Sequence, residues 1–233
     1  MTEQFSSLER DLGYNFENTA LLSEAMCHSS YVNEQHDPSL KDNERFEFLG
    51  DSVLDLVITH MLMDHFPETC EGDLSRMRAL IVNESQLAEA ARKLKLGDYI
   101  ILGKGEALSH GERKISILAD TFEALIAAVY VDGGFHAAFK VIEEHFTEVV
   151  SHVEKRLAVE DFKSQLQEYV QGRFRIVPRY EVVRESGPDH EKTFEVRLSV
   201  SDFLTTYGTG KSKKAAEQAA ACLALEQVRQ ETE

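Results

Sequence analysis

The chain of 233 residues is long enough for one large domain or two small ones, and its formal net charge is −16. That charge excludes a protein that binds nucleic acid over its whole surface, because an acidic majority repels a polyanion. The charge is uneven, since residues 1–160 carry −15 and residues 161–230 carry +1. Affinity for nucleic acid would have to come from local basic groups or from bound cations.

The three cysteines, Cys27, Cys70 and Cys222, are widely spaced and form no CxxC pair. This pattern argues against a disulfide framework and against a zinc site, and it predicts reduced thiols in a cytoplasmic protein. The first residues are polar and acidic, and the sequence has no run of about 20 apolar residues. We therefore expect neither a signal peptide nor a transmembrane segment.

Helical periodicity dominates the first 150 residues. A short amphipathic helix is predicted at Leu21–Met26, and it is followed by a polar loop that begins near His28. A longer helix is predicted from Asn43, as its N-cap, to about Phe66, where Pro67 follows. Almost no strand pattern is visible in this part of the chain.

The start of the longer helix, NERFEFLGDSVLDL, is the most informative segment of the chain. On a helix, Glu44, Glu47 and Asp51 fall within an arc of roughly 60°, with apolar residues on the opposite side. Like charges three or four positions apart repel each other by a few tenths of a kcal/mol. A bound cation would offset this repulsion. The alternative is an ordinary solvated face of a surface helix.

Residues 71–73 are predicted to be a break, and residues 74–96 an interrupted helical stretch. The glycine-containing sequences LGKGE and SHGER predict a loop over residues 99–114. The next segment, ISILADTFEALIAAVYV, is mostly apolar and is therefore expected to be a buried helix over residues 115–131. It is predicted to stop at the Asp-Gly-Gly sequence 132–134, before one more helix.

Asp120 and Glu123 are the only charges of that buried segment. Burying an unpartnered carboxylate costs several kcal/mol, so either arginine or lysine partners or a metal ion must compensate for these two. If the two helices pack with their acidic faces together, Glu47, Asp51, Asp120 and Glu123 form an all-oxygen cluster. Such ligands suit Mg²⁺ or Mn²⁺ rather than zinc.

The sequence period changes in the last third of the chain. Residues 193–200, TFEVRLSV, alternate strictly between the two faces of a half-exposed strand. Neighbouring strands are predicted at 180–184 and 203–207, and helices at 162–171 and 213–229. The predicted order in this part is α-β-β-β-α.

Lys211, Lys213 and Lys214 lie at the start of the last predicted helix, where Ser212 can act as the cap. Lysines oppose the helix dipole at this end, whereas a bound phosphate would be favoured by the dipole, the free N–H groups and the ammonium groups together. A helix and a sheet loop can reach successive minor grooves of an A-form duplex. The alternative is a solvated basic patch.

These motifs resemble bacterial ribonuclease III. NERFEFLGDSVLDL and ILADTFEALIAAVY are similar to its acidic signature segments, and KSQLQEYVQ, GPDHEKTF and GKSKKAAEQAAA to its double-stranded-RNA-binding domain. The resemblance covers nearly the whole chain, with Ala128 replacing a common glycine. It implies an all-α catalytic domain over residues 1–152 that forms a homodimer, a linker over 153–160 and an α-β-β-β-α domain over 161–230.

The resemblance also implies the reaction, which is hydrolysis of both strands of double-stranded RNA to 5′-phosphate and 3′-hydroxyl ends. This reaction would process ribosomal and other structured precursor RNAs. Mg²⁺ is the implied cofactor, Mn²⁺ a substitute, and no small-molecule cofactor or membrane partner is expected. The implied metal ligands are Glu47, Asp120 and Glu123. Asp51 is implied to belong to the same site, and Asp51 and Glu123 are the residues implied to affect turnover directly. Glu44 and Glu71 are implied to lie nearby, and Phe48 to insert into the other subunit.

In the binding domain the resemblance implies two groove contacts and one phosphate contact. The residues are Ser164, Gln167 and Gln171 for one minor groove, Pro188 and His190 for another, and Lys211, Lys213 and Lys214 for the phosphates between them. Two alternatives remain open. A non-catalytic dimeric RNA binder would have no need of the costly acidic quartet, and a phosphohydrolase of small nucleotides would have no need of the lysine cluster.

Overall fold

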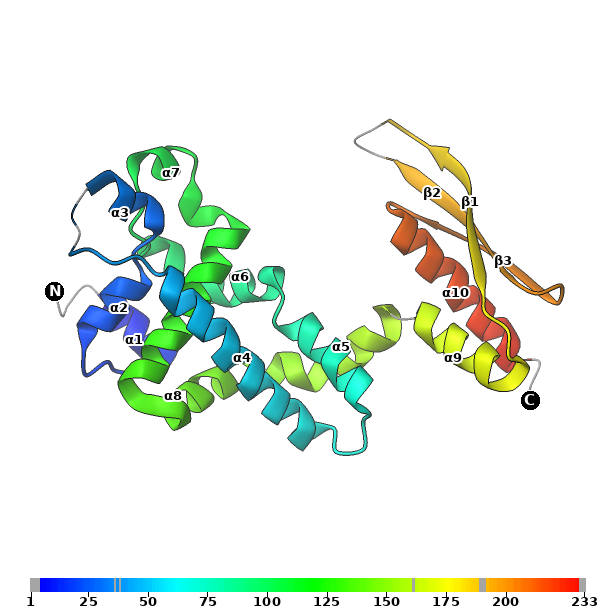
Figure 1. Ribbon diagram of the computed structural model, residues 1–233, viewed down its shortest axis with the longest axis horizontal. Coiled ribbons are helices and arrows are strands. Elements are labelled where there is room, and N and C mark those ends of the chain that lie inside the picture. The colour runs from blue at the N-terminus through cyan, green and yellow to red at the C-terminus, as the bar shows by residue number, and fades with distance from the viewer. Residues whose placement is uncertain (1–4, 36, 38, 161, 189–191, 231–233) are drawn as a thin grey trace. The chain divides into compact units, whose positions relative to one another are not determined.

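The computed structural model describes residues 5–35, 37, 39–160, 162–188 and 192–230 (Figure 1). The chain divides into two compact units, Met1–Val153 and Glu154–Glu233, which are described separately below. Among the described residues, no helix combines the length and the apolar character needed to cross a bilayer.

The first unit is helical, as predicted. Its elements are α1 (Ser6–Leu12), α2 (Thr19–Ala25), α3 (Ser29–Gln35), α4 (Glu44–His65), α5 (Glu71–Ile81), α6 (Glu84–Lys93), η1 (Leu96–Asp98), α7 (Lys104–Leu108), η2 (Gly111–Arg113) and α8 (Ile115–Glu160), which continues past the boundary between the units. The described part of this unit contains no β-strand. The isolated β-bridge found there joins Cys27 and Ile101.

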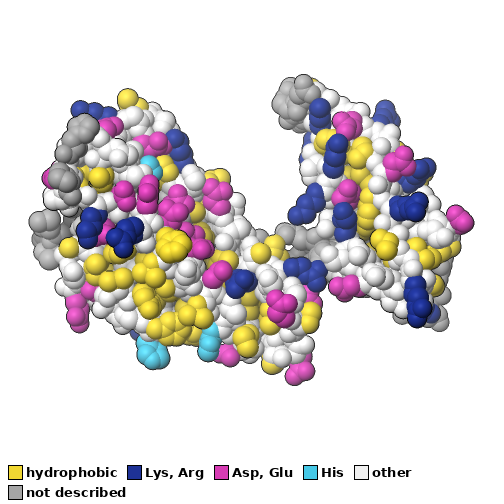
Figure 2. All heavy atoms as spheres, in the orientation of Figure 1, with side chains coloured by type: hydrophobic (Ala, Val, Ile, Leu, Met, Phe, Trp, Pro, Cys, Tyr) yellow, Lys and Arg dark blue, Asp and Glu magenta, His cyan; other side chains and the backbone are white. Residues whose placement is uncertain are grey.

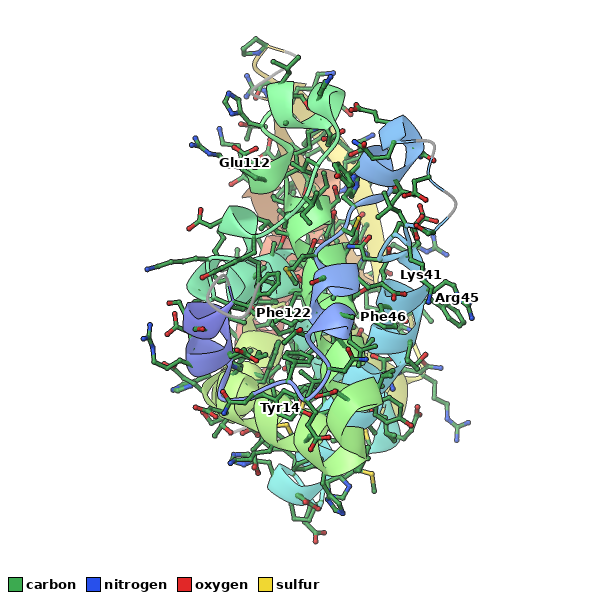
Figure 3. All side chains as sticks on the ribbon, turned by 90° about the vertical axis from the view of Figure 1, so that its left-hand side faces the viewer. Tyr14, Lys41, Arg45, Phe46, Glu112 and Phe122 are labelled. Atoms are coloured by element: carbon green, nitrogen blue, oxygen red, sulfur yellow. The ribbon has the colours of Figure 1, made fainter. Side chains whose placement is uncertain are left out.

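Helix α8 runs through the middle of the first unit. Residues 124–129 are fully buried, and so is Phe122, whose ring centroid lies 5.9 Å from that of Phe146 on the same long helix. Figure 3 shows Phe122 among the surrounding helices, in the interior of the unit. The prediction of a buried helix from its apolar sequence is therefore confirmed.

Helices α4 and α8 touch backbone to backbone at Gly50. A Cβ atom on Gly50 would lie 1.9 Å from the carbonyl oxygen of Glu123, which is far inside van der Waals contact. Only glycine permits this approach, because it has no Cβ. The contact lies one helical turn from Glu47 and therefore brings the acidic stretches of the two helices together.

The predicted stop at residues 132–134 is a kink inside α8. Gly134 has φ 76° and ψ −174°, outside helical geometry, and helical structure resumes after it. The Asp132 carboxylate accepts hydrogen bonds from the Tyr14 hydroxyl at 2.8 Å and from the backbone N–H groups of Glu17 and Asn18 at 2.8 and 3.0 Å. These bonds attach the end of the first half of α8 to the segment before α2.

Two segments that were predicted to be loops contain short helices. Helix α3 lies in the expected loop after His28, and α7 and η2 lie in the expected loop 99–114. The Glu34 carboxylate accepts from the backbone N–H of Lys104 at 2.9 Å, and Gly103 N–H donates to the Ser30 hydroxyl at 3.0 Å. Contacts between distant segments therefore hold these helices, and local periodicity does not show such contacts.

Two predictions about where and how helices begin need correction. Helix α5 begins at Glu71, inside the predicted break. Asn43 precedes α4 as predicted, but its side chain makes no capping hydrogen bond and is 2% exposed. Its amide group donates to the carbonyl oxygen of Ala25 at 3.3 Å, so it joins α4 to the end of α2.

The second unit has the predicted α-β-β-β-α order. It consists of α9 (Phe162–Phe174), β1 (Arg179–Ser186), β2 (Thr193–Val200), β3 (Leu204–Gly210) and α10 (Lys213–Gln230). The strands form an antiparallel sheet in the order β1-β2-β3, with a bulge between Val182 and Arg184. In β2, Val196, Leu198 and Val200 are buried, and their face packs on the two helices, with Leu166 and Leu225 in the same core.

Candidate active site

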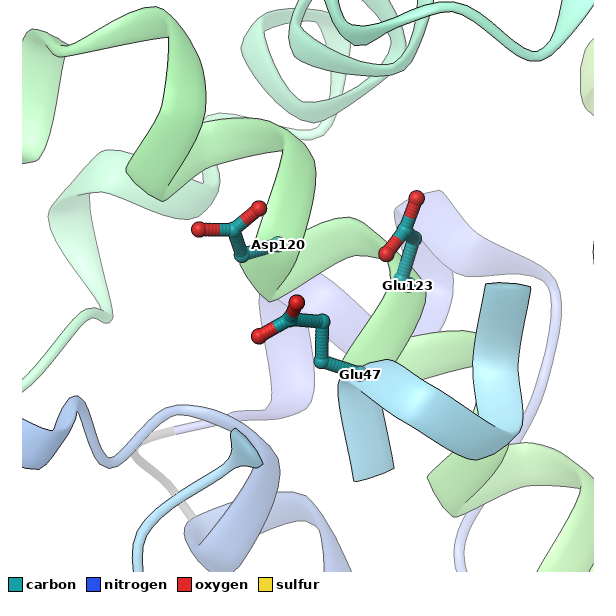
Figure 4. Close-up of side chains that lie close together, drawn as sticks. All are labelled: Glu47, Asp120 and Glu123. Atoms are coloured by element: carbon teal, nitrogen blue, oxygen red, sulfur yellow. The ribbon is translucent and has the colours of Figure 1, made fainter. Parts of the chain in front are cut away.

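Three carboxylates from two helices converge in the first unit. One oxygen from each of Glu47 on α4 and Asp120 and Glu123 on α8 lies within 4.8 Å of the others, and all three side chains are half-buried (Figure 4). Figure 2 shows acidic side chains gathered on this unit beside hydrophobic ones. The predicted convergence of acids from two distant stretches is observed for these three. Asp51, the fourth predicted member, is exposed and lies outside this group.

The electrostatics of the cluster are unfavourable in the absence of a cation. The pKa of Glu123 is raised to about 8, first by burial and then by the charges of Asp51, Glu47, Asp120 and Asp55, in that order. Burial also raises the pKa of Glu47, with contributions from Asp120, Glu44 and Asp51. Asp51 and Glu44 are thus close enough to act on the cluster by their charge.

In the described part of the chain, no lysine or arginine lies within 4.0 Å of these three carboxylates. The alternative of ion pairs with basic side chains is therefore not what the structure shows. Three oxygen ligands whose mutual repulsion is not relieved by a basic side chain fit a hard divalent cation.

His28 and Glu84 also act on the cluster. Burial and the charge of Glu84 raise the pKa of Asp120, and the charge of His28 lowers it. The backbone N–H of Ser30 lies 3.2 Å from the Nδ1 atom of His28 and orients its ring. No sequence pattern indicates Glu84, because its proximity to Asp120 depends on how α6 packs.

Phe48 lies next to Glu47 on α4 but points into solvent, with 79% of its surface exposed. It lines a hollow of about 720 Å³ together with Lys41, Arg45 and Phe46. Figure 3 shows Lys41 and Arg45 at the surface of this unit. Single exposed apolar side chains are common on protein surfaces, and Leu56 and Met63 on the same helix are each 58% exposed.

The basic residues of the second unit gather where α10 begins. Lys211, Lys213 and Lys214 are exposed, and the Ser212 hydroxyl accepts from the backbone N–H of Ala215 at 3.1 Å, as predicted for the cap. Lys213 Nζ lies 3.3 Å from a carboxylate oxygen of Glu185. The cluster is therefore partly neutralised by the neighbouring strand.

The other residues that were predicted to contact RNA lie on α9 and after β1. Gln167 and Gln171 are exposed, and Ser164 on the same helix is half-buried. Pro188 is exposed after the end of β1, and His190 lies outside the described residues. The three α9 residues recur at helical spacing and so share one face.

Comparison with known proteins supplies the family. Residues 18–150, more than half of the chain, match the Ribonuclease-III-like family, and residues 162–228 match the double-stranded RNA binding motif. The chain belongs to the ribonuclease III family. As a member of that family it is an endoribonuclease, with a double-stranded-RNA-binding domain after its nuclease domain.

The relatives of this ribonuclease III cover nearly its full length. It is 46% identical to the Ribonuclease 3 of Syntrophobacter fumaroxidans in an alignment of 230 residues that covers 97% of this chain and 95% of that protein. It is 44% identical to the Ribonuclease 3 of Myxococcus xanthus, covering 99% of this chain and 88% of that protein. A solved nuclease domain of ribonuclease III from Campylobacter jejuni, described with flexibility in a region involved in dimer formation, is 40% identical with a TM-score of 0.56. The match covers 62% of this chain and 99% of the solved nuclease domain.

Glu71 lies away from the acidic cluster of Glu47, Asp120 and Glu123. It begins α5 and lines a hollow of about 280 Å³ with Thr59, Leu62 and Met63 of α4. These positions are 12 to 16 residues after Glu47 on the same helix, which corresponds to about 18–24 Å along its axis. The structure therefore brings Glu44 but not Glu71 to the cluster.

Proposed function

We propose that this ribonuclease III hydrolyses both strands of double-stranded RNA in a Mg²⁺-dependent reaction that leaves 5′-phosphate and 3′-hydroxyl ends. Ribosomal and other structured precursor RNAs are the proposed substrates, and the cytoplasm is the proposed location, where its free cysteines stay reduced. The observation that carries the proposal is the cluster of Glu47, Asp120 and Glu123, which has no basic partner among the described residues.

In this proposal Glu47, Asp120 and Glu123 hold the cation. A Mg²⁺ ion held by these carboxylates would supply Lewis-acid chemistry for hydrolysis, by activating water and by stabilising negative charge on the phosphate. Mn²⁺ accepts the same oxygen ligands and is expected to substitute. Glu123 binds the cation as a carboxylate, so it has to lose the proton that its raised pKa favours near neutral pH.

Asp51 and Glu44 contribute through their position beside the ligands. Asp51 is exposed, and after burial its charge is the largest influence on the pKa of Glu123. We assign to Asp51 a direct role in turnover, at the solvent side of the cluster where RNA arrives. Glu44 adds negative charge next to Glu47 and thereby strengthens the attraction of a cation.

The proposed enzyme is a homodimer that holds double-stranded RNA with its second unit. Exposed Phe48 is the proposed anchor between the two copies. The groove contacts come from one face of α9 and from Pro188 and His190 after β1. Lys211, Lys213 and Lys214 contact the phosphates, where the start of α10 adds the positive end of its dipole.

Incubation with a long RNA duplex tests this function. With Mg²⁺ we expect both strands to be shortened to 5′-phosphorylated products, and with EDTA we expect intact RNA that is still retarded in a gel. Full-length RNA that persists with Mg²⁺, together with normal retardation, would establish a non-catalytic RNA binder instead. Release of phosphate from mononucleotides would establish a phosphohydrolase of small substrates.

A further inference from the structure

An exposed arginine and aromatic surface lies at one end of the second unit, where α9 leads into β1 and where β2 turns into β3 (Figure 1). We define the arginine–aromatic end by its residues, Arg173, Phe174, Arg175, Val177, Arg179 and Phe203. Figure 2 shows hydrophobic side chains flanked by Lys and Arg side chains in the lower right of this unit. None of the contacts proposed above uses this surface.

Two aromatic rings are exposed at this end. Phe174 and Phe203 are 42% and 48% exposed, and their ring centroids lie 5.2 Å apart with 51° between the ring planes. Val177 beside them is 55% exposed. The rings therefore contact each other and still present apolar faces to solvent, which a stacking ligand could cover.

Two arginines next to these rings line a hollow of about 660 Å³. Arg175 and Arg179 share it with Ser199, Ser201 and Asp202. Within the described residues, neither guanidinium lies within 4.0 Å of a carboxylate. Arg175, Arg179 and Asp202, the charged residues that line the hollow, leave it a net charge of +1 in a chain whose total is −16. The hollow is thus a local site for an anion on an acidic protein.

The backbone on both sides of the hollow has an unusual conformation. Arg175 has φ 56° and Ser201 has φ 49°, both in the left-handed region that residues other than glycine rarely adopt. Such conformations persist where the surrounding structure fixes them, and they cluster at ligand sites. The two residues therefore border a shaped hollow.

The proposed duplex contacts on α9 lead towards this end. Gln167 and Gln171 lie on one helix face. Arg175 directly follows α9, and its backbone N–H donates to the carbonyl oxygen of Gln171 at 3.1 Å. RNA that lies along α9 would reach Arg175 next. This step depends on the function proposed above.

We propose that the arginine–aromatic end binds an unpaired RNA segment that continues from the bound duplex. Unpaired bases stack on exposed aromatic rings, and arginines hold the phosphates between them. The bases of a duplex are already stacked on each other and cannot use Phe174 and Phe203. The combination of the two rings with Arg175 and Arg179 therefore selects single-stranded RNA next to a duplex.

The test compares two RNAs, a blunt duplex of about 20 base pairs and the same duplex with an extension of about eight unpaired nucleotides. Binding is measured by fluorescence anisotropy in EDTA, where no cleavage occurs. We expect the native protein to bind the extended RNA at least about fivefold more tightly, as stacking of one or more bases predicts. Arg175→Gln/Arg179→Gln and, separately, Phe203→Leu should remove this gain and leave blunt-duplex binding unchanged.

The controls separate this inference from the proposed function. Arg10→Gln/Arg92→Gln makes the same charge change in the first unit and should keep the tighter binding of the extended RNA. Lys214→Ala should weaken the binding of both RNAs equally. Equal affinity of the native protein for the two RNAs would overturn the inference. An equal loss of affinity for both RNAs in the Arg175→Gln/Arg179→Gln variant would also overturn it. Failure to bind the blunt duplex at all would instead contradict the function proposed for the second unit.

Discussion

Glu123 is the acid whose ionisation the fold opposes most among those discussed. In the metal-free protein its pKa is about 8, raised first by burial and then by Asp51, compared with an ordinary value of 4.5. Between these pH values the folded state binds more protons than the unfolded state. The free energy of unfolding is therefore expected to fall as pH rises from about 4.5 to about 8.

Urea unfolding in EDTA at about pH 5.5 and about pH 8.5 measures this dependence. Glu123→Gln cannot ionise and should flatten it, with greater stability than the native protein at the higher pH. Saturating Mg²⁺ should restore stability to the native protein at high pH, because the cation binds the ionised carboxylates of the folded state. The same pH dependence in the native protein and in Glu123→Gln would contradict the raised pKa.

Glu123→Ala tests the same residue through catalysis. It removes one of three proposed ligands, so cleavage of duplex RNA should fall by more than about 100-fold. Binding of the duplex should change by less than about twofold, because the proposed RNA contacts lie in the second unit. Glu89→Ala, an exposed acid that pairs with Arg92, is the control for loss of one negative charge. Parallel loss of binding and cleavage would count against the ligand assignment.

At the scale of residues, the sequence predicted the three converging acids because two charges in an apolar helix require compensation. Asp51 was expected as a fourth member of the cluster, but it lies exposed beside it. The helical arc that placed Glu44, Glu47 and Asp51 together does not tell which of them faces the other helix. The effects of His28 and Glu84 on Asp120 depend on packing between distant segments, which no local pattern shows.

At the scale of elements, the site depends on the close approach of α4 and α8. Gly50→Ala would place a methyl group 1.9 Å from the carbonyl oxygen of Glu123, so the helices must separate. We expect a loss of stability of about 1–3 kcal/mol or more and weaker binding of Mn²⁺, because Glu47 moves away from Asp120 and Glu123. Thermal unfolding and calorimetric titration measure the two effects.

Gly72→Ala is the matched control, because Gly72 lies in helix α5 and a Cβ there would meet nothing within 4 Å. This change should be neutral or stabilise the protein by up to about 1 kcal/mol, since alanine favours helix more than glycine does. If Gly50→Ala behaved in the same way as Gly72→Ala, the backbone contact between α4 and α8 would not position the metal ligands.

The long helices and the middle strand were predictable because their sequences keep one period over many residues. Residues 193–200 form β2 with the predicted bounds. The short helices α3 and α7 were not predictable, because helices of five to seven residues are unstable alone and here depend on hydrogen bonds from distant segments.

At the scale of the whole molecule, Phe48 is the proposed contact between the two copies of the dimer. Its side chain is 79% exposed, so Phe48→Ala should hardly change the unfolding of a subunit. If it anchors the dimer, its removal should weaken dimerisation by about 2 kcal/mol, or roughly 30-fold. Sedimentation at low concentration measures this, with Leu108→Ala, at 84% exposure, as the control. An unchanged dissociation constant would argue against Phe48 as the anchor.

The organisation into a helical part and a mixed part was visible in the sequence, because the charge and the sequence period both change in the last third. The course of the chain between the parts was not visible. Helix α8 continues through residues 153–160, whose sequence contains neither glycine nor proline and so gives no end signal. The composition of this segment indicates no linker, and only the charge shift and the elements that follow it indicate a boundary.

The metal centre is the central claim, and a crystal soaked in Mn²⁺ tests it most directly. We predict an anomalous peak about 2.1 Å from carboxylate oxygens of Glu47, Asp120 and Glu123. The claim would be contradicted by well-ordered carboxylates with no anomalous peak between them, or by an arginine or lysine side chain occupying the space where the ion should bind.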